Sequence, residues 1–371
     1  MERYEKYKES DIEWVGEIPE HWEVKKIKHF CYVKGRVGWK GLKSSDFLQK
    51  GYAYLVTGTD FKTNRINWEK CYNIDQKRYE EDPYIQLKND DLLITKDGTI
   101  GKLAIVDKLD KPACLNSGIF VVRSLDQQLS TQYLYWVLYS DVFKKFNGYT
   151  TYGSTIQHLY QNVFVDFSYT LPSIIEQFKI SNYLKIKTKE IDELIAQKVC
   201  LLELYEKEKE VIINQAVTKG IDPDVRLKDS GIAWLGEIPE HWKLTKIGYS
   251  TTIVRGASPR PAGSPRYFNG DFMPWITVKE VTNAIGKNIK STETFLTEEG
   301  SKLSRIIQPE TLLLSNSGAT LGVPKIAKIE GCINDGSGAF INFESNLLRD
   351  FLYWFFVSHT QIYREKMKGN G

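Results

Sequence analysis

Between residues 174 and 218 the hydrophobic positions recur at helical spacing, in a stretch without glycine or proline. The spacing is close to a 3.5-residue seam, and lysine and glutamate fill the other faces. The apolar positions are Ile180, Leu184, Ile191, Leu194, Ile195, Leu201, Leu202, Tyr205, Ile212 and Ala216. Ser173 and Glu176 form an S-x-x-E capping box before this stretch, and Lys219-Gly220 supplies a stop signal after it.

This pattern predicts one helix of roughly 65–70 Å, at about 1.5 Å per residue. Such a helix is too long to be buried in one small domain, so its apolar stripe needs a partner helix. The alternative is a solvated linker helix, which would leave the whole stripe exposed at a cost in free energy.

Before the helix, short apolar runs rich in β-formers are punctuated by glycine and aspartate, which predicts strands. The runs are Tyr52–Thr57, Leu92–Thr95, Leu103–Val106 and Ile119–Arg123. The pattern then predicts a short helix around Thr131–Phe146 and a further strand at Val163–Phe167, before Leu171-Pro172. The segment is therefore predicted to be a mixed α/β domain with a bias toward strands.

The chain contains an internal repeat. Residues 10–27 and 230–247 match at twelve of eighteen positions, at an offset of 220. Weaker matches follow at offsets between 218 and 220: Leu92–Ile94 with Leu312–Leu314, Cys114–Asn116 with Cys332–Asn334, and Leu134–Trp136 with Leu352–Trp354. A period this long indicates two copies of one globular domain. Residues 36–88 and 255–309 differ, so the copies share a framework and diverge between its parts.

We therefore predict an α+β protein with two related mixed α/β domains joined by a long helix of the coiled-coil type. The predicted first domain is 1–172, the helix with its flanks is 173–220, and the second domain is 221–371.

The composition is that of a globular protein, with 42% hydrophobic and 26% charged residues in a chain of 371. No run approaches the ~20 apolar residues of a membrane span, and the charged first ten residues are unlike a secretory signal. The five cysteines are scattered without a C-x-x-C pair, which favours a reducing cytoplasm over a disulfide framework or a zinc site. Because the net charge is only +3, any affinity for nucleic acid must come from a local basic face.

The chain resembles the specificity subunits of type I restriction–modification systems. The resemblance rests on W-x-G-E-I-P-E-H-W at Trp14–Trp22 and again at Trp234–Trp242. Leu92–Gly101, Gly153–Gln157, Leu171-Pro172 and Glu176-Gln177 reinforce it. It implies two target-recognition domains, joined by long helices that pack as an antiparallel coiled coil. It further implies a bipartite target in double-stranded DNA, and assembly with methyltransferase and translocase/nuclease subunits.

The sequence departs from this family pattern in one respect. The second copy reaches Gly371, which aligns near Gly153, so it has no counterpart of residues 154–220. We expect a second half that is truncated relative to the family, and self-association or complementation through the helix at 174–218.

We expect the chain not to be an enzyme and to need no cofactor or metal. Asp82-Pro83-Tyr84 lacks one proline of an amino-methyltransferase motif, and Gly98–Lys102 lacks the length of a phosphate loop, so both are interpreted as turns. His21 and His241 recur at the same place in both copies, which favours a framework role. No nucleophile triad or carboxylate pair can be assembled from the sequence.

The residues expected to touch DNA are basic or short polar side chains in the divergent stretches and in turns after strands. In the first copy they are Lys34, Arg36, Lys40, Thr59, Asp60, Lys62, Lys96, Asp97, Thr99, Tyr152, Ser154 and Thr155. In the second copy they are Arg255, Arg260, Arg266, Thr277, Lys279, Asn316 and Ser317. The alternative for the basic run 255–266 is an ordinary mobile loop.

Two other functions remain open on the sequence alone. The chain could be the recognition part of a self-contained restriction–methylation enzyme, although it carries no methylation or nuclease motif. It could also be a non-DNA adaptor with two binding modules on a coiled-coil spacer. DNA binding that releases counterions weakens steeply with salt, which separates it from the adaptor function.

Overall fold

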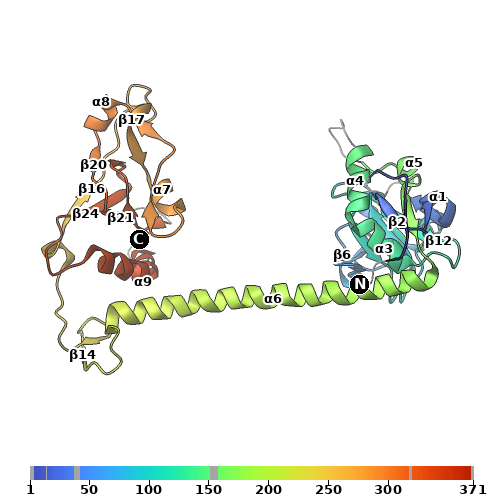
Figure 1. The fold of residues 1–371 in the computed structure, drawn as a ribbon, viewed down its shortest axis with the longest axis horizontal. Helices are drawn as coiled ribbons and strands as arrows, with labels where there is room; N and C mark the ends of the chain where they lie inside the picture. Colours follow the sequence, from blue (N-terminus) through green and yellow to red (C-terminus); the bar gives the residue numbers. More distant parts are fainter. Residues whose placement is uncertain (1–3, 14, 37–41, 151–157, 317–319, 369–371) are drawn as a thin grey trace. The chain divides into compact units, whose positions relative to one another are not determined.

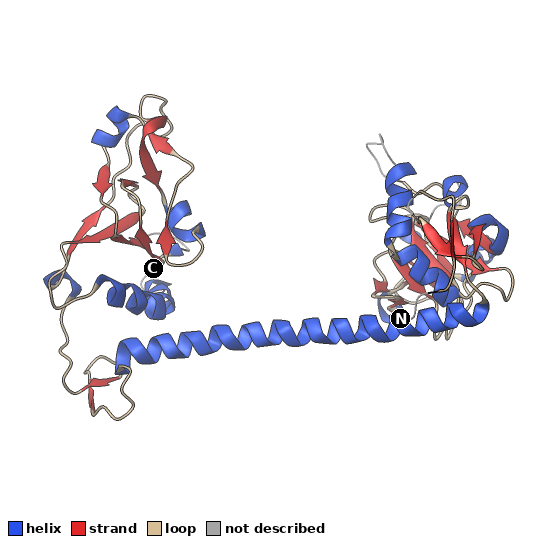
Figure 2. Cartoon of the chain, viewed as in Figure 1, coloured by secondary structure: helices blue, strands red, loops and turns tan. Residues whose placement is uncertain are grey.

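The computed structural model of the chain describes residues 4–13, 15–36, 42–150, 158–316 and 320–368. The chain forms two compact units, Met1–Ile195 (unit 1) and Ala196–Gly371 (unit 2). In each unit, sheets are flanked by helices, and α6 (Ile174–Lys219) belongs partly to each (Figures 1 and 2). The division falls inside α6, whereas the predicted domain borders lie just outside its two ends. No described helix is long and apolar enough to cross a membrane.

Unit 1 contains a six-stranded sheet with the order β4-β12-β9-β10-β7-β6 and a three-stranded sheet with the order β11-β5-β8. The first comprises β4 (Cys31–Gly35), β12 (Ile119–Ser124), β9 (Leu92–Thr95), β10 (Leu103–Ile105), β7 (Arg65–Ile66) and β6 (Phe61–Lys62). The second comprises β11 (Ala113–Leu115), β5 (Ala53–Val56) and β8 (Tyr72–Ile74). The four predicted strands are confirmed as β5, β9, β10 and β12.

Strand β9 is buried on both faces and contributes side chains to two hydrophobic clusters. Leu93 packs in a cluster with Leu55 of the three-stranded sheet, whereas Leu92 and Ile94 pack in a second cluster with the helical residue Tyr133. Successive side chains of a strand point to opposite faces, so a strand covered on both sides is apolar at every position. The order of layers is therefore helices, six-stranded sheet and three-stranded sheet.

The helical layer contains α3 (Thr131–Tyr139) and α4 (Asp141–Thr150). The prediction of one helix over 131–146 is wrong because Ser140 interrupts it with an extended backbone, at φ −73° and ψ 169°. The Ser140 hydroxyl accepts a hydrogen bond from the Val142 amide at 3.3 Å, which satisfies one of the free amides at the start of the second helix.

The largely apolar run 163–167 does not form the strand that the sequence predicts. It forms the end of α5 (Gln161–Phe164) and the turn that follows, and the strand β13 (Ser168–Leu171) begins after it. Phe164 and Phe167 are fully buried, with ring centroids 5.9 and 5.3 Å from that of Phe143. An apolar run of this length fits a buried helix or a buried strand equally well, and the packing against α4 decides between them.

The long helix α6 confirms the prediction for residues 174–218. Its capping box is formed as expected: the Ser173 amide donates to Glu176 Oε2 at 3.2 Å, and the Glu176 amide donates to Ser173 Oγ at 3.4 Å. Buried residues occur near its two ends, whereas every residue from 189 to 212 is exposed. The apolar stripe along the middle of α6 therefore faces solvent in the described structure.

Unit 2 repeats the layering with a five-stranded sheet, β16-β24-β21-β22-β18, and a four-stranded sheet, β19-β17-β23-β20. The first comprises β16 (Thr252–Arg255), β24 (Ser337–Ile341), β21 (Thr311–Ser315), β22 (Pro324–Ala327) and β18 (Asn288–Ile289). The second comprises β19 (Phe295–Leu296), β17 (Phe268–Ile276), β23 (Gly331–Ile333) and β20 (Arg305–Ile307). Leu313 packs with Ile333 of the four-stranded sheet, and Leu312 packs with Leu352 of α9 (Arg349–Lys368).

The repeated motif forms the same hairpin in each unit. In unit 1, β1 (Tyr7–Glu9) pairs with β2 (Glu17–Pro19), and in unit 2, β14 (Leu227–Asp229) pairs with β15 (Glu237–Pro239). The two registers correspond residue by residue at an offset of 220. The remaining elements are β3 (Glu23–Lys26), α1 (Ile27–Phe30), α2 (Gln76–Glu80), α7 (Val278–Asn283), α8 (Glu298–Lys302) and the 3-10 turns Ser44–Asp46, Trp68–Lys70, Pro83–Ile85 and Ile247–Tyr249.

Candidate nucleic-acid interface

Four strands of unit 1 end at the same edge of the domain. Strands β4 and β9 both pair antiparallel with β12 and so run in the same direction, while β5 and β11 are parallel to each other. Backbone hydrogen bonds join the loops that follow them: the Lys96 amide donates to Gly118 O, and the Asn116 amide donates to Val56 O, both at 2.9 Å. We call the loops after β4, β5, β9 and β11 the loop edge of unit 1. Loops held in this way by a rigid sheet are suited to binding.

The hydroxyl group of Thr95 fixes the turn that follows β9. Thr95 Oγ1 donates to the Thr99 carbonyl at 2.6 Å, which fixes the turn above the end of the strand. Asp97 and Thr99 are exposed, and the Asp97 carboxylate pairs with the imidazole of His158. The Lys96 ammonium lies 5.1 Å from the ring centre of Phe120. The turn thus presents short polar side chains, as the sequence predicts for this position.

The loop after β5 is shaped by a buried carboxylate. Asp60 Oδ2 accepts hydrogen bonds from the Thr57 amide at 2.7 Å and the Thr57 hydroxyl at 2.9 Å, and the residue is 4% exposed. Burial raises the pKa of Asp60 above its ordinary value although the Thr57 hydrogen bonds oppose the shift. At Gly58 a Cβ would lie 2.9 Å from Cγ2 of Thr95, so this loop sits directly on the end of β9. Thr59 remains exposed at the tip.

Arg36 does not reach the surface. It is 3% exposed, its Nε donates to the Leu115 carbonyl at 3.0 Å, and its Nη2 lies 3.5 Å from Cys114 Sγ. The guanidinium therefore ties the end of β4 to the end of β11. The predicted direct DNA contact of Arg36 and Asp60 disagrees with the structure. Each side chain is buried, and each holds a loop in position.

The two exposed lysines predicted for unit 1 lie far apart in the six-stranded sheet. Lys34 is on β4 at one border of the sheet, and Lys62 is on β6 at the other. Only Lys34 belongs to a strand that ends in the loop edge. The predicted contacts Lys40, Tyr152, Ser154, Thr155 and Ser317 lie outside the described residues.

Unit 2 has a loop edge built by the same backbone bonds. The Asn316 amide donates to Gly336 O at 3.0 Å, and the Asn334 amide donates to Ile276 O at 3.2 Å. These bonds join the loops after β21, β23 and β17, as the corresponding bonds do after β9, β11 and β5 in unit 1. The duplication detected in the sequence therefore extends to individual hydrogen bonds of the edge.

Three predicted residues of unit 2 converge on Asp335, which the sequence analysis missed. Arg255 Nε donates to the Asp335 carbonyl at 3.2 Å, Asn316 Nδ2 donates to it at 3.3 Å, and Arg260 Nη2 lies 3.6 Å from Asp335 Oδ2. The Ser258 hydroxyl donates to Asp335 Oδ1 at 2.6 Å, and this hydrogen bond, with smaller effects of the arginines, lowers the pKa of Asp335. Two guanidinium groups lie at one aspartate, Arg260 at its carboxylate and Arg255 at its backbone carbonyl. They leave a net positive charge and further N–H donors, which suit phosphate and base edges. The only sequence signal for Asp335 is its place in a polar turn directly after β23.

Arg266 lies apart from this group. Its Nε is 2.5 Å from Glu299 Oε2 at the start of α8, and this ion pair raises the pKa of the guanidinium. Among the described residues, no side-chain contact joins Arg266 to the loops around Asp335, so the predicted basic run 255–266 divides into two parts.

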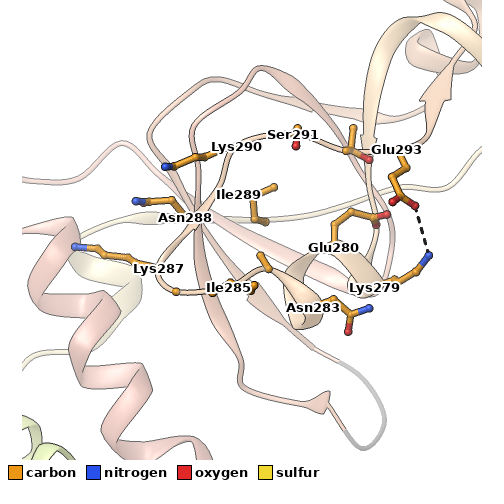
Figure 3. A pocket seen from close by; sticks show the side chains of 13 residues that line it. Lys279, Glu280, Asn283, Ile285, Lys287, Asn288, Ile289, Lys290, Ser291 and Glu293 are labelled. Atoms are coloured by element: carbon orange, nitrogen blue, oxygen red, sulfur yellow. Dashed lines mark ion pairs between the residues drawn. The ribbon is translucent and has the colours of Figure 1, made fainter. Parts of the chain in front are cut away.

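Thr277 and Lys279 occupy the start of α7. Thr277 is the N-cap of that helix and forms a capping box with Glu280, so its hydroxyl is already used. Lys279 points toward Glu293, with 3.9 Å between Nζ and Oε2, beside an open pocket between α7 and residues 284–293 (Figure 3). The pocket has a volume of about 670 Å³ and carries further lysines on its opposite wall (Figure 3).

Comparison with known proteins gives a consistent result. Residues 19–203 match the family described as Type I restriction modification DNA specificity domain. The MjaVIII specificity subunit of Methanocaldococcus jannaschii is 29% identical over 58% of this chain, and the match spans only 49% of that subunit's length. The putative MjaX specificity subunit of the same organism is 26% identical over 98% of this chain and 81% of its own length.

Two solved structures share the fold. A chain from a structure of a type I R-M system has a TM-score of 0.67 and 17% identity, and covers 92% of this chain and 80% of its own. The HsdS subunit from Thermoanaerobacter tengcongensis has a TM-score of 0.61 and 15% identity, with the same coverage. These likenesses confirm the predicted fold class: one long helix between two sheet-rich domains. The family match over residues 19–203, the similar specificity subunits and the shared fold together support a type I restriction–modification specificity subunit.

Proposed function

We propose that the chain reads duplex DNA through its two loop edges, each of which recognises one part of a bipartite target. This proposal rests on one observation. The loop edges of the two units share their backbone hydrogen bonds but carry different exposed side chains. The hydrogen bonds of Lys96 and Asn116 in unit 1 correspond to those of Asn316 and Asn334 in unit 2. Because the scaffold is shared and the exposed side chains differ, the two edges would read different sequences, and the complete target would be asymmetric.

The proposed contact surface consists of the exposed or half-buried predicted residues on the two loop edges. These are Lys34, Thr59, Lys96, Asp97 and Thr99 in unit 1, and Arg255, Arg260 and Asn316 in unit 2. Lysine and arginine would bind phosphates, and the short polar side chains would reach base edges. Arg36, Asp60 and Thr277 would act indirectly, since each holds a loop or a helix start in place.

In this proposal the chain itself carries out no catalysis. It would direct methyltransferase subunits, and through them a restriction/translocase subunit, to the target; the names of the related proteins support this role. The exposed stripe of α6 supports self-association, because apolar side chains between 189 and 212 are covered by nothing in the described structure. A cytoplasmic location follows from this role and from the scattered free cysteines.

Genome-wide methylation profiling tests the proposal. A host that expresses the chain with its neighbouring methyltransferase is compared with the same host without the gene. Loss of a bipartite, asymmetric methylated motif on deletion is the expected result, and it names the target. A palindromic motif would instead indicate two copies of the chain that each contribute one unit.

Unchanged methylation, together with an affinity for duplex DNA that does not fall steeply with salt, would contradict the proposal. DNA binding that neutralises phosphates weakens in proportion to the number of counterions released. A salt-independent partner interaction would favour the non-DNA adaptor.

A further inference from the structure

An aromatic pair of unit 2 is occupied by a lysine of the same unit. Tyr353 and Trp354 of α9 lie edge to face, with ring centroids 5.0 Å apart. The Lys287 ammonium lies 5.0 Å from the ring centre of Tyr353 and 5.8 Å from that of Trp354. The same ammonium is 2.7 Å from Asp350 Oδ2. Aromatic rings and a carboxylate both stabilise a cation, so Lys287 has a favourable site here.

Unit 1 contains the same aromatic pair. Tyr135 and Trp136 of α3 are the counterparts at an offset of 218, and their ring centroids are 5.1 Å apart. The interplanar angle is 82°, against 78° in unit 2. Both residues line a pocket of about 390 Å³, formed by α3, β7, β10 and the first turns of α6. Pockets of this size are large enough to bind a small ligand or a side chain.

The residue of unit 1 that takes the place of Lys287 is Asn64. The Ile105 amide donates to the Asn64 carbonyl, and the Ile326 amide donates to the Lys287 carbonyl, both at 2.9 Å. The strands also correspond, since β7 pairs parallel with β10 and β18 pairs parallel with β22. Asparagine is neutral and shorter than lysine, so this position supplies no cation to the rings of unit 1.

A carboxylate beside the aromatic pair is satisfied in unit 2 and free in unit 1. In unit 2, Glu310 lies 2.5 Å from Lys328 Nζ and 2.6 Å from Arg349 Nη1. Its counterpart is Asp90, and both residues have a left-handed backbone, with φ 68° at Glu310 and 69° at Asp90. Asp90 is exposed and lines the pocket, and its carboxylate forms no ion pair with any described residue.

The other charged groups of the pocket have different effects on a cation. Asp107, the counterpart of Lys328, is half-buried and lies 3.1 Å from the guanidinium of Arg65, so its charge is already balanced. Lys185 of α6 also lines the pocket and repels a second cation. The rings and Asp90 therefore attract a cation, and Lys185 opposes it, which gives substitutions with effects of opposite sign.

We propose that this pocket of unit 1 binds the ammonium group of a lysine side chain from another protein. The ammonium lies against the rings of Tyr135 and Trp136, as Lys287 does against the equivalent rings of unit 2, and Asp90 balances its charge. The occupied site of unit 2 is the template for this assignment. A free diamine carries the same chemical group, so the ligand class is a primary alkylammonium, and the experiment distinguishes the two sources.

The test uses the full-length chain labelled with 5-fluorotryptophan and observed by fluorine NMR, without DNA. The chain has 9 tryptophans, and the resonance of Trp136 is the one that is lost in Trp136→Phe. The probe is the peptide acetyl-Gly-Lys-Gly-amide, titrated at constant ionic strength. A saturable shift of the Trp136 resonance is expected. The same peptide acetylated at the lysine Nε keeps the aliphatic chain but loses the charge, and it is expected to cause no shift.

Two substitutions should change the affinity in opposite directions. Asp90→Asn removes the free carboxylate, keeps a residue that tolerates positive φ, and should weaken binding about threefold or more. Lys185→Gln removes the like charge and should strengthen binding by about twofold. Asp11→Asn is the matched control, because Asp11 is exposed, has a φ of 57° and lies outside the pocket lining. It should leave the affinity unchanged.

A double substitution tests the comparison with unit 2 directly. Asn64→Lys with Gln132→Asp introduces the lysine and the carboxylate that unit 2 has at these places, Lys287 and Asp350. The chain's own cation should then occupy the rings and weaken binding of the peptide about tenfold or more, since an intramolecular group has a high effective concentration. Circular dichroism and the other tryptophan resonances check that each variant is folded.

Three results would overturn the proposal: no saturable shift of the Trp136 resonance, an equal shift with the acetylated peptide, or unchanged binding in the double variant. Cadaverine, a free diamine, is titrated in parallel. Weaker binding of cadaverine than of the peptide supports a lysine within a polypeptide, whereas equal or tighter binding would assign the pocket to free amines and overturn the protein source. Because the assay contains no DNA, its failure is distinct from a failure of the proposed DNA-reading function.

Discussion

Trp22 and Glu176 join the two ends of the first domain: the indole Nε1 donates to Glu176 Oε1 at 3.3 Å across 154 residues of chain. The same oxygen lies 2.9 Å from His21 Nε2, while Oε2 caps the helix start through Ser173. One carboxylate thus fixes both the repeated motif and the direction in which α6 leaves unit 1.

Glu176→Gln is expected to destabilise unit 1 by about 1–3 kcal/mol, because an amide accepts weaker hydrogen bonds than a carboxylate and places an N–H₂ opposite a donor. Denaturant unfolding followed by tryptophan fluorescence measures the loss. Glu190→Gln, on the exposed part of the same helix, should change stability by less than about 0.5 kcal/mol. Equal effects of the two substitutions would mean that the capping carboxylate is not important for stability.

The same carboxylate makes stability depend on pH. Burial alone would raise the pKa of Glu176, but hydrogen bonds from His21, Ser173 and Trp22 outweigh it and lower the pKa from 4.5 to about 2. The unfolded chain then holds the proton more tightly than the folded one, so the contribution is complete above about pH 5 and is lost as the pH falls from 4.5 toward 2. In Glu176→Gln this part of the acid dependence should disappear, which an unfolding series between pH 2 and pH 6 can measure.

Asp91→Asn is expected to cost about 2–4 kcal/mol of stability, since it leaves a partly buried guanidinium without its carboxylate. The Asp91 side chain is 1% exposed and binds Arg123 through both oxygens, at 2.6 and 2.7 Å. Asp107→Asn is the matched control because Asp107 is only half-buried and its partner Arg65 is exposed, so a loss below about 1 kcal/mol is expected. Thermal unfolding of the two variants distinguishes them; a comparable loss in both would contradict the argument from burial.

Arg255→Ala and Arg260→Ala should each weaken DNA binding and lower the slope of log affinity against log salt by about 1. Both guanidinium groups lie at Asp335 on the loop edge of unit 2. Arg266→Ala removes the same charge but lies beside Glu299, so its affinity and salt slope should stay close to those of the wild type. If all three substitutions act alike, the effect is one of net charge, and the loop edge is not the contact surface.

Leu194→Gln with Leu202→Gln should weaken self-association of the chain by about tenfold or more, because the two side chains are 52% and 65% exposed on the apolar stripe of α6. Sedimentation velocity over a range of concentrations measures the change. Lys189→Gln, which lies outside the stripe, is the control and should have no effect. A wild-type chain that stays monomeric at every concentration would refute self-association through this helix.

The features that the sequence predicted are those encoded by neighbouring residues. The start of α6 follows from Ser173 and Glu176, three positions apart, and its length follows from a periodic stripe without glycine or proline. The strands β9 and β12 follow from short apolar runs between turn residues. The local signal failed at Ser140, where a single extended residue divides a helix, and at 163–167, where an apolar run fits two kinds of element.

The sequence by itself determined the duplication, the long helix and the family, because repeats, periodicity and capping are properties of the order of residues. Only the tertiary structure decided which predicted contact residues are available. It buried Arg36 against Leu115 and Asp60 beneath its own loop, and it brought Arg255 to Asp335, 80 positions away. Whether a side chain is buried, and which distant residue it meets, depends on how the sheets pack between residues far apart in the sequence. The positions of charged residues along the sequence do not specify that packing.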